Sequence, residues 1–571
     1  MGDLLFFYHE RGELANFEAE GVWFGVLCVR ICTSKMWYGG SSMAGVIAAG
    51  GRETAVAGAE MLRRGGNAVD AAVAAAFVSF IAEIGVVHLG GSGIAQLYDA
   101  RNGRSVVYDF FSDMPGKGGT PPERLDFERV TIDFGPTTQD FYLGRASVAV
   151  PGNIVGLCRM AADYGRLPLA TLLEPAMRLA REGVILDEFQ ANTCALLAPL
   201  YTHTTEMRQI FAPNGHIVQP GERLFIPHLA ETLAELAAEG EQFARNGRLA
   251  QAIVHDQQKN GGLLTPQDLL EYQVRQLSAI RIPYREFEVL LPPPSSAGGV
   301  LIAFSLKLLS HFDIATYPHG SARHLQLLYE IMAATTRARL YWDRWSEEMP
   351  VAEAVGRFLS DEFVTQFFIE IEKAIHRGRP GTAHPEQATH PDTSHLSVID
   401  GDGLAVSLTT TAGESAGYVV PKTGYIPNNM LGEADLHPSG FHTRPAGQRI
   451  PTMMTPTVVL KDGRIRLVVG SGGSIRIRSA ILQVLSNLLD FRMRLNEAVN
   501  TARVHLEDGV LQCEAGYDAA AVAELERMGY GVNRWDRRSI YFGGAHSVSW
   551  ADDGRLVAAG DNRRGGAVAS V

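Results

Sequence analysis

The chain has 571 residues, of which 46% are hydrophobic and 20% charged, a composition typical of a folded globular protein. Its formal net charge of -12 and the lack of any Lys/Arg block disfavour nucleic acids and anionic membrane surfaces as partners, and leave small molecules or peptides. The cysteines are scattered and odd in number, which predicts neither a disulfide framework nor a zinc site: Cys28, Cys32, Cys158, Cys194 and Cys513.

Residues 1–42 give the least information about structure or function of any part of the sequence. An apolar run at residues 22–29 has the length of a signal core, but acidic residues precede it where a signal peptide carries net positive charge. We therefore expect no cleavable signal and a cytoplasmic location. We interpret this stretch as an N-terminal extension, or as the result of a start site placed upstream of the true one at Met36 or Met43.

Residues 69–89 are apolar enough to suggest a membrane span. They contain Asp70 and Glu83, however, and an acid near the centre of a bilayer costs about 2.5 kcal/mol or more. A buried core helix is the better prediction. We interpret His88, at the end of this segment, as a buried and hydrogen-bonded histidine rather than a catalytic one.

The next part of the chain alternates between strand and helix patterns. Residues 105–111 predict a strand, and residues 154–290 have a helical period, as in 169–183 and 229–244. Together they predict a helical layer beside a sheet. Residues 377–392 are polar, with three prolines and no periodicity, which is typical of a linker.

A predicted β-hairpin follows this linker. Residues 395–400 and 404–411 are rich in β-branched and aliphatic side chains and flank a Gly-Asp-Gly turn signal. With the turn centred on Asp402, Thr393 lies opposite Thr411. Directly opposed residues on one face of a sheet have Cβ atoms roughly 4.5 to 5.5 Å apart. Two hydroxyl groups therefore meet at the start of the first strand.

This geometry suggests that Thr393 is an N-terminal nucleophile. A threonine hydroxyl needs a base beside it, and cleavage of the bond after Asp392 would free the α-amine of Thr393 for that purpose. An α-amine has an unperturbed pKa of about 7.7 to 8.0, so part of it is an unprotonated base near neutral pH. In this hypothesis Thr393 makes the cut itself by attacking the Asp392 carbonyl, and Thr411 hydrogen-bonds and orients Thr393.

A glycine-rich turn lies further along the chain. Residues 465–469 predict a strand, residues 470–474 (GSGGS) a turn, and residues 475–489 a helix. A glycine-rich turn from strand to helix points backbone N–H groups at an anion. A phosphate cradle and simple tight packing are alternative explanations of the same pattern.

Residues 413–417 (GESAG) match the G-x-S-x-G nucleophile elbow of serine hydrolases. The elbow must open a helix, yet β-branched residues and a proline follow it here. No HGGG-type oxyanion motif is found in the sequence either. The serine-hydrolase hypothesis is therefore the weaker one.

Several segments resemble the γ-glutamyltransferases (γ-glutamyl transpeptidases), which are self-processing N-terminal-nucleophile hydrolases. The segments are TSHLSVIDGDGLAVSLTTT, VVPKTGYIPNNM, MMTPTVVLKDG and GSGGS in the second part of the chain, and GGNAVDAAVAAAF, VAVPGNIVG, LLEPAMRLAREG, KNGGLLTPQDLLEY and PPPSSAGG in the first. The resemblance implies an α+β fold, a four-layer αββα sandwich. It also implies autocleavage into a large subunit (residues 43–392) and a small subunit (393–571) that form a heterodimer, with no cofactor and no metal.

The resemblance assigns further roles to individual positions. It implies that Gly472 and Gly473 form the oxyanion hole. The positions that hold a γ-glutamyl substrate in the family correspond here to Phe111, Gly413, Met430, Glu433, Thr452 and Met453. Phe111 replaces the arginine that binds the α-carboxylate, and neither phenylalanine nor methionine can replace a bidentate arginine. Only Glu433 keeps its charge and Thr452 its hydroxyl.

The sequence thus predicts intact acyl-transfer machinery with a more apolar acyl pocket and weak binding of glutathione. The function we expect is hydrolysis or acyl transfer on an amide through an acyl-enzyme on Thr393. Alternatives are an acylase, an amidohydrolase or a carbon–carbon bond hydrolase of a specialised pathway. An inactive homologue that acts as a binding protein is a further alternative. Bacterial members of the resembled family are often exported, which bears against the cytoplasmic expectation.

Overall fold

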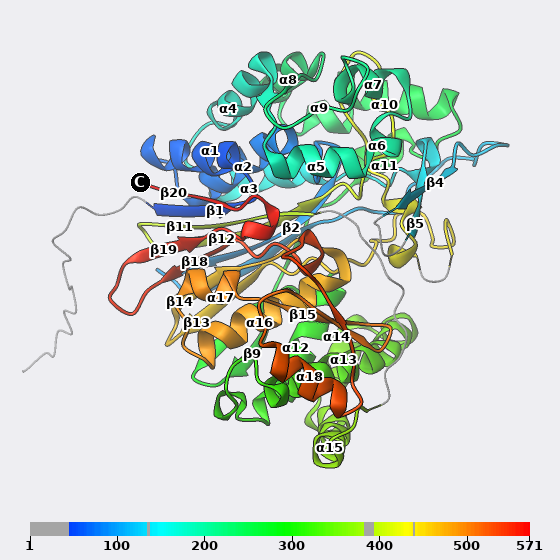
Figure 1. The fold of residues 1–571 in the computed structure, drawn as a ribbon. Coiled ribbons are helices and arrows are strands. Elements are labelled where there is room, and N and C mark those ends of the chain that lie inside the picture. The colour runs from blue at the N-terminus through cyan, green and yellow to red at the C-terminus, as the bar shows by residue number, and fades with distance from the viewer. Residues whose placement is uncertain (1–44, 134–137, 382–392, 438–439) are drawn as a thin grey trace, which may run out of the picture. The chain divides into compact units, whose positions relative to one another are not determined.

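Helices and strands build two β-sheets between two helical layers in the computed structural model (Figure 1). The four layers are an α+β, αββα sandwich, so the predicted fold class is confirmed. The structure describes residues 45–133, 138–381, 393–437 and 440–571. The expected N-terminal extension, linker residues 382–391, Asp392, Cys28 and Cys32 lie outside the described residues.

The first sheet contains the predicted hairpin at its centre. All its strand pairs are antiparallel. In spatial order its strands are β20 (Ala567–Ser570), β1 (Gly45–Ala49), β11 (Ser394–Asp400), β12 (Leu404–Thr411), β2 (Ser92–Asp99), β3 (Arg104–Phe110) and β8 (Arg275–Leu277). Strands from both ends of the described chain therefore pair beside the hairpin.

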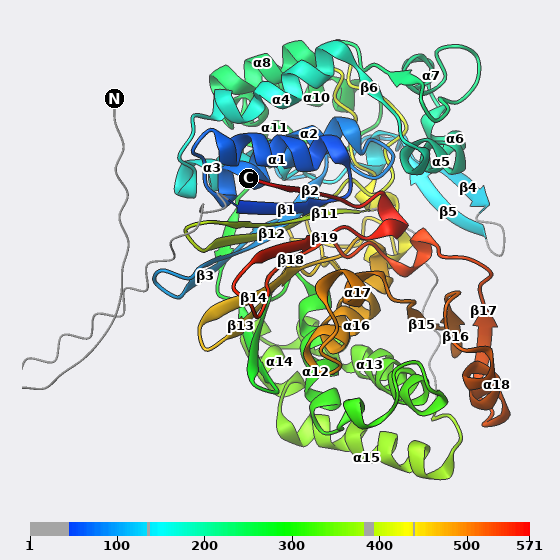
Figure 2. The same ribbon diagram turned by 60° about the vertical axis from the view of Figure 1, so that its left-hand side comes forward.

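The second sheet packs face to face against the first (Figure 2). In spatial order its strands are β19 (Leu556–Ala559), β18 (Ser547–Trp550), β14 (Arg464–Val469), β13 (Thr457–Lys461), β10 (Phe287–Leu291) and β9 (Ile280–Tyr284). Smaller sheets are formed by β4 (Glu128–Asp133) with β5 (Thr138–Leu143), by β6 (Val184–Ile185) with β7 (Arg223–Leu224), and by β15 (Val504–Glu507), β16 (Val510–Cys513) and β17 (Gly531–Arg534).

One helical layer covers the outer face of the first sheet. Its central helix, α2 (Ala68–Ala82), is buried along its whole length, which confirms the prediction of a core helix. Asn67 and Asp70 form a capping box at its start, so the charge of Asp70 is satisfied by backbone N–H groups. The other helices are α1 (Arg52–Arg63), α3 (Asn153–Tyr164), α4 (Leu169–Glu182), α5 (Glu188–Leu196), α6 (Ala198–Tyr201), α7 (Thr205–Phe211), α8 (Leu229–Glu239), α9 (Gln242–Arg245), α10 (Arg248–Lys259) and α11 (Pro266–Glu271).

The second helical layer covers the outer face of the second sheet (Figures 1 and 2). It contains α12 (Ala297–Ser310), α13 (Ala322–Glu348), α14 (Val351–Phe358), α15 (Asp361–Arg377), α16 (Ile477–Leu489), α17 (Leu495–Asn500) and α18 (Ala519–Arg527). Among the described residues, no helix combines the length and the apolar character that a membrane crossing requires.

The predicted helical period over residues 154–290 is wrong after α11. Strands β8, β9 and β10 occupy this part of the chain. In β9 the side chains of Ile282 and Tyr284 are buried while Arg281 and Pro283 are exposed, which is the two-residue alternation of a strand. Arg285, with φ 56°, makes the turn into β10. The alternation is short, and the long helical segments before it obscured it.

The predicted hairpin register is confirmed. Ser394 pairs with Thr410 and Ile399 with Ala405, so the register that places Thr393 opposite Thr411 is the observed one. The same strands face the second sheet, where Val46, Ile399, Val458 and Val468 belong to the apolar core between the sheets.

Ser407 of β12 joins the two sheets by hydrogen bonds. Its Oγ donates to the carbonyl of Val469 on β14 at 2.9 Å and accepts from the N–H of Thr457 on β13 at 3.1 Å. The side chain is fully buried, so water cannot replace it. Its hydroxyl is the buried polar partner of two backbone groups on the opposite sheet.

Replacing Ser407 with alanine should lower the free energy of unfolding by about 1–3 kcal/mol, because it leaves two buried backbone groups without a partner. Urea denaturation followed by tryptophan fluorescence measures this difference. The matched control is Ser310→Ala, at an exposed serine, where the change should stay within about 0.5 kcal/mol. Equal effects of the two substitutions would contradict the bridging role of Ser407.

Candidate active site

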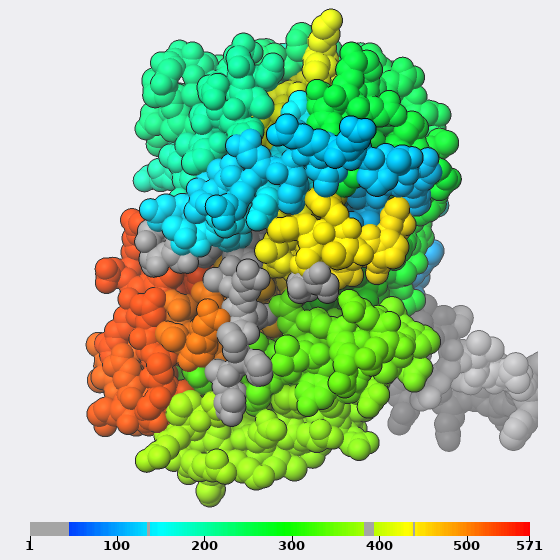
Figure 3. Space-filling view, turned by 90° about the vertical axis from the view of Figure 1, so that its right-hand side faces the viewer, coloured from blue at the N-terminus to red at the C-terminus, as the bar shows by residue number. Residues whose placement is uncertain are grey.

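A pocket at the start of β11 brings the sequence-predicted site residues together. Thr393 and Thr411 both line it, with 5% and 7% of their surface exposed. About 350 Å³ of empty space lies within it, part of it open solvent. Its other lining residues are Phe111, Gly413, Met430, Glu433, Asp435, Leu436, Thr452, Met453, Met454, Ser474 and Ile477. Figure 3 shows the face where the β4–β5 hairpin (cyan), the segment after β12 (yellow) and helices α13 to α15 (green) come together.

Glu83 anchors the start of β11 from the helical layer. It follows the last residue of α2, and its Oε2 accepts a hydrogen bond from the Ser394 hydroxyl at 2.5 Å. Its Oε1 accepts one from the Thr54 hydroxyl at 2.6 Å. A Cβ on Gly50 would lie only 2.4 Å from Glu83 Oε2, so this close approach requires glycine. Glu83 therefore fixes the residue that follows the predicted nucleophile.

Burial changes the protonation of this carboxyl group. Complete desolvation raises the pKa of Glu83 to about 7, although the hydrogen bonds from Ser394 and Thr54 lower it. The negative charges of Asp187 and Glu53 raise it further. The group thus carries a proton in the folded protein over a pH range in which an exposed glutamate is ionised.

Arg564 lies on the other side of the same strand start. Its Nη1 makes a long contact of 3.5 Å with the Thr393 carbonyl oxygen, and its Nη2 donates to the Ile540 carbonyl at 3.3 Å. The segment that carries it is held by a buried network in which Asp561 pairs with Arg503 at 2.7 Å and with Arg563 at 3.0 Å. Burial would raise the pKa of Asp561, but the two guanidinium groups hold it well below its usual range.

The glycine-rich turn lies directly against Thr393. The predicted strand, turn and helix are observed as β14, residues 470–473, and a short 3₁₀ turn (Ser474–Arg476) that leads into α16. A Cβ on Gly472 would lie 2.1 Å from the Thr393 carbonyl oxygen, and Gly473 has φ +117°, so both positions require glycine. The N–H of Gly472 donates to Gly544 at 3.4 Å, which is a long bond. An oxyanion role would require this N–H to turn toward the substrate.

Phe111 forms an apolar wall of the pocket. It follows β3 and is 1% exposed, in the same apolar cluster as Met430 and Met453. The nearby guanidinium of Arg449 does not replace the missing arginine, because it is fully engaged elsewhere. It binds Asp109 at 2.8 Å and Asp113 at 2.7 Å, and its Nη2 donates to the Gln273 carbonyl.

The carboxylate of Glu433 packs directly against the backbone of Gly413. A Cβ on Gly413 would lie 2.1 Å from Glu433 Oε1 and 2.2 Å from Asn429 Oδ1. Asn429 Oδ1 in turn accepts hydrogen bonds from the N–H groups of Glu414 and Ser415. The carboxylate of Glu433 thus occupies the space into which a side chain at position 413 would extend.

Thr452 and Met453 line the pocket from the segment before β13. The N–H of Thr452 donates to the Ser295 carbonyl at 3.0 Å, and its hydroxyl accepts from the N–H of Met454 at 3.2 Å. Met453 is 9% exposed and belongs to the same apolar cluster as Phe111. Every substrate-binding position that the sequence predicted therefore lies at this pocket.

Ser415 does not form a nucleophile elbow. It is fully buried, and no helix follows it among the described residues 416–429. Its Oγ accepts a hydrogen bond from the N–H of Gly417 at 3.0 Å. The structure therefore argues against the serine-hydrolase hypothesis, as the sequence did.

Two histidines near the site are packing residues. His395 is buried between the hydroxyls of Thr409 and Ser397, both at 2.9 Å, and desolvation lowers its pKa well below the usual range. His88 contacts the carbonyl of Glu414 through Nε2 at 3.2 Å, and burial lowers its pKa to about 4. Neither lines the pocket of Thr393. The interpretation of His88 as a buried histidine is confirmed.

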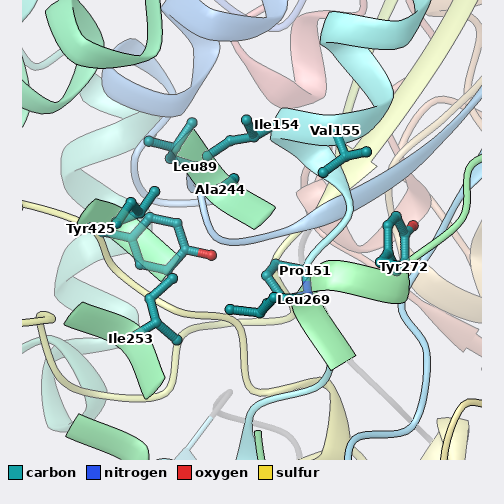
Figure 4. Close-up of a pocket in the computed structure, with 10 residues that line it drawn as sticks. Leu89, Pro151, Ile154, Val155, Ala244, Ile253, Leu269, Tyr272 and Tyr425 are labelled. Atoms are coloured by element: carbon teal, nitrogen blue, oxygen red, sulfur yellow. The ribbon is translucent and has the colours of Figure 1, made fainter. Parts of the chain in front are cut away.

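A second cavity lies apart from this site (Figure 4). It is lined mainly by apolar side chains, among them Leu89, Ile154, Ile253 and Tyr425, and it contains none of the predicted site residues. The hydroxyl of Tyr272, another lining residue, donates to the Phe111 carbonyl at 2.6 Å. The cavity wall thus supports the backbone of the pocket of Thr393, but it presents no nucleophile.

Comparison with known proteins shows the family. The gamma-glutamyltranspeptidase family model matches residues 54–571. The chain belongs to the gamma-glutamyltranspeptidase family. It is 34% identical over 507 residues to the Acylase ACY 1 proenzyme of Pseudomonas sp. (strain SE83), covering 88% of this chain and 89% of the relative. It is 30% identical over 529 residues to the Glutathione hydrolase proenzyme of Escherichia coli (strain K12), covering 89% and 88%.

A solved structure with the same fold is the cephalosporin acylase from Bacillus halodurans. It has a TM-score of 0.79 and 26% identity, and the match covers 92% of this chain and 96% of that one. The gamma-glutamyltranspeptidase family and its acylase relatives are enzymes. The prediction of a family enzyme with hydrolase or acyltransferase chemistry is therefore confirmed.

Two features of the candidate site in this gamma-glutamyltranspeptidase-family chain were missed in the sequence. Arg564 gave no signal, because an arginine pair near the C-terminus has no distinctive spacing. Asp435 was also missed, although it lies two residues after Glu433 and lines the pocket. Glu83 was noted only as a charge in an apolar segment. The sequence did contain a signal for Glu83, because a charged residue within an apolar segment is expected to be buried and to need a hydrogen-bond partner.

Replacing Glu83 with glutamine should flatten the pH dependence of stability in this family member. The pKa of Glu83 in the folded protein, about 7, exceeds the ordinary 4.5. Its contribution to the free energy of unfolding is therefore fully present below pH 4.5 and is lost as the pH rises toward 7, by up to about 3 kcal/mol. Urea denaturation of both proteins at pH 5, 6 and 7.5 tests this. The wild type should lose stability relative to Glu83→Gln as pH rises, and parallel curves would refute the assignment.

Proposed function

We propose that the chain is a self-processing enzyme that cleaves its own backbone between Asp392 and Thr393 and then uses Thr393 to hydrolyse or transfer the acyl group of an amide. Both curated relatives above are named proenzymes, which supports processing into two subunits of one chain. The observation that carries the proposal is the pocket that Thr393 and Thr411 share with the apolar side chains of Phe111, Met430 and Met453.

The cut follows from the position of Thr393 at the start of a buried strand. Its Oγ attacks the Asp392 carbonyl, and the acyl group moves from the Thr393 nitrogen to its oxygen. Water then hydrolyses the ester, which frees the carboxyl of Asp392 and the α-amine of Thr393. Anchoring by Glu83 on one side and Arg564 on the other holds the strand start in place during these steps.

The same hydroxyl then serves the external substrate. The freed α-amine takes the proton of Thr393 Oγ as the oxygen attacks the amide carbonyl, and it returns the proton to the leaving amine. Gly472 lies against the Thr393 carbonyl and Gly473 follows it, and these two residues would supply the N–H donors for the oxyanion once the Gly472 N–H turns from Gly544 toward the substrate. Water releases the acyl group in hydrolysis, whereas an amine accepts it in transfer.

The pocket favours an acyl group other than γ-glutamyl. Phe111 stands where the family arginine binds the α-carboxylate, and Arg449 is saturated by Asp109 and Asp113. A buried carboxylate without a cationic partner is costly, so glutathione should bind poorly. An acylase and a cephalosporin acylase among the similar proteins support an acylase activity. The apolar character of the acyl group is inferred from Phe111, Met430 and Met453 in the pocket.

Thr393→Ala should abolish processing and activity together. Intact mass and N-terminal sequencing of the wild type should reveal a fragment beginning Thr-Ser-His-Leu, and this fragment should be absent from the variant. Ser415→Ala is the matched control, because that hydroxyl is buried away from the pocket, and its processing should be normal. A wild-type chain that stays uncut, or a Ser415→Ala variant that loses activity, would overturn the proposal.

The enzyme should prefer acyl anilides that lack an α-carboxylate. We expect kcat/KM for γ-glutamyl-p-nitroanilide to be at least roughly ten-fold lower than for hexanoyl-p-nitroanilide, which corresponds to about 1.4 kcal/mol of transition-state binding. Release of p-nitroaniline measures both rates. Equal or better turnover of the γ-glutamyl substrate would show that the acyl pocket has not been altered in the proposed way.

A further inference from the structure

Asp435 is a pocket carboxylate with one oxygen left unused. It belongs to the short 3₁₀ turn Ala434–Leu436 and lines the pocket of Thr393. Its Oδ2 accepts a hydrogen bond from the Ser474 hydroxyl at 3.0 Å. Its Oδ1 is shielded from solvent and has no hydrogen-bond partner among the described residues. A buried carboxylate oxygen of this kind is expected to have a donor, and the pocket is the place from which one can come.

The nearest cations are bound to other groups. Arg339 and Arg476 act on Asp435 electrostatically, but Arg339 pairs with Asp343 at 3.4 Å, and the guanidinium of Arg476 stacks 4.7 Å from the ring centre of Tyr541. Burial raises the pKa of Asp435, while the Ser474 hydrogen bond, the charges of these two arginines and the residue's own backbone N–H lower it. No lysine, arginine or histidine is found among the residues that line the pocket.

The carboxylates of Asp435 and Glu433 are held at the pocket by contacts with different segments of the chain. Ser474, which holds Asp435, directly follows the glycine pair of the 470–474 turn. Glu433 fills the space above Gly413, at the end of β12. The remaining wall is mostly apolar, with Phe111 and Met453 among its side chains. A ligand that matches this wall is an apolar chain with a cationic end.

We propose that Asp435, held by Ser474, binds an ammonium group of the substrate and thereby selects amides whose acyl chain is apolar, carries a protonated amine and lacks a carboxylate. This inference rests on the proposed function, because it names the substrate class of the same pocket. A charge-assisted hydrogen bond from the ammonium satisfies Oδ1 and replaces the cation that the pocket wall does not provide.

A purely structural role for Asp435 makes a different prediction. If the carboxylate only held Ser474 and the adjoining glycine turn, its loss would lower the turnover of every acyl substrate by the same factor. A binding role changes the ratio between a cationic and a neutral substrate of equal size. The ratio therefore separates the two roles.

The test uses three p-nitroanilides that differ only at the end of a four-methylene acyl chain: 5-aminopentanoyl, hexanoyl and adipoyl. In the processed wild type, kcat/KM for 5-aminopentanoyl should exceed that for hexanoyl about ten-fold or more, and adipoyl should be the poorest. In Asp435→Asn the ratio of 5-aminopentanoyl to hexanoyl should fall to near one. Asp361→Asn, at a carboxylate that is 93% exposed, is the matched control and should keep the wild-type ratio.

Calorimetry with n-pentylammonium and n-pentanol gives a readout that needs no turnover. The wild type should bind the ammonium at least ten-fold more tightly than the alcohol, and Asp435→Asn should remove this difference. Equal binding in the wild type, or a preference that survives in Asp435→Asn, would overturn the inference. If the chain is uncut and all three anilides are inert, the proposed function fails, and calorimetry still decides the ammonium site.

Discussion

The antiparallel pairing of β11 with β12 is the constraint on which the site depends. It lies at the centre of a sheet whose neighbouring strands, β1 and β2, are buried on both sides of the hairpin. A slip of one residue would turn every side chain of β11 to the opposite face. The apolar core between the sheets, which includes Ile399, prevents such a slip. The same register therefore places Thr393 opposite Thr411 and keeps both hydroxyls at one pocket.

The strand start is fixed by groups from distant parts of the chain. Glu83 reaches Ser394 from the helical layer, and Arg564 reaches the Thr393 carbonyl from the C-terminal segment. Both are buried polar side chains, and a buried polar group that lost its hydrogen-bond partner would be costly. The network of Asp561, Arg503 and Arg563 satisfies the charges around this segment. Rigidity at the proposed nucleophile thus comes from buried polar contacts as well as from the sheet.

The proposed nucleophile and the side chains of the proposed acyl pocket come from different parts of the fold. The proposed nucleophile and the glycine turn belong to strand ends, where backbone geometry is set by the two sheets. Among the side chains that the resemblance marks as altered, Phe111 and Met453 lie in connecting segments, and Met430 begins a short 3₁₀ turn (Met430–Gly432). Side chains there can change without moving the strands.

Local pattern was enough to predict the hairpin, the buried helix α2 and the glycine turn, because alternation, turn residues and motif spacing all act over short stretches of chain. The αββα fold class was implied by the resemblance to the γ-glutamyltransferases. The same resemblance predicted that Phe111 and Met453 lie at a substrate pocket, and the structure places both at the pocket of Thr393. Strands β8 to β10 were missed, since a brief two-residue alternation after a long helical region carries little signal. The contacts of Glu83, Arg564 and Asp435 arise only in the folded chain. Each joins residues far apart in sequence, and which buried charge meets which donor depends on the packing of the layers rather than on any nearby residue.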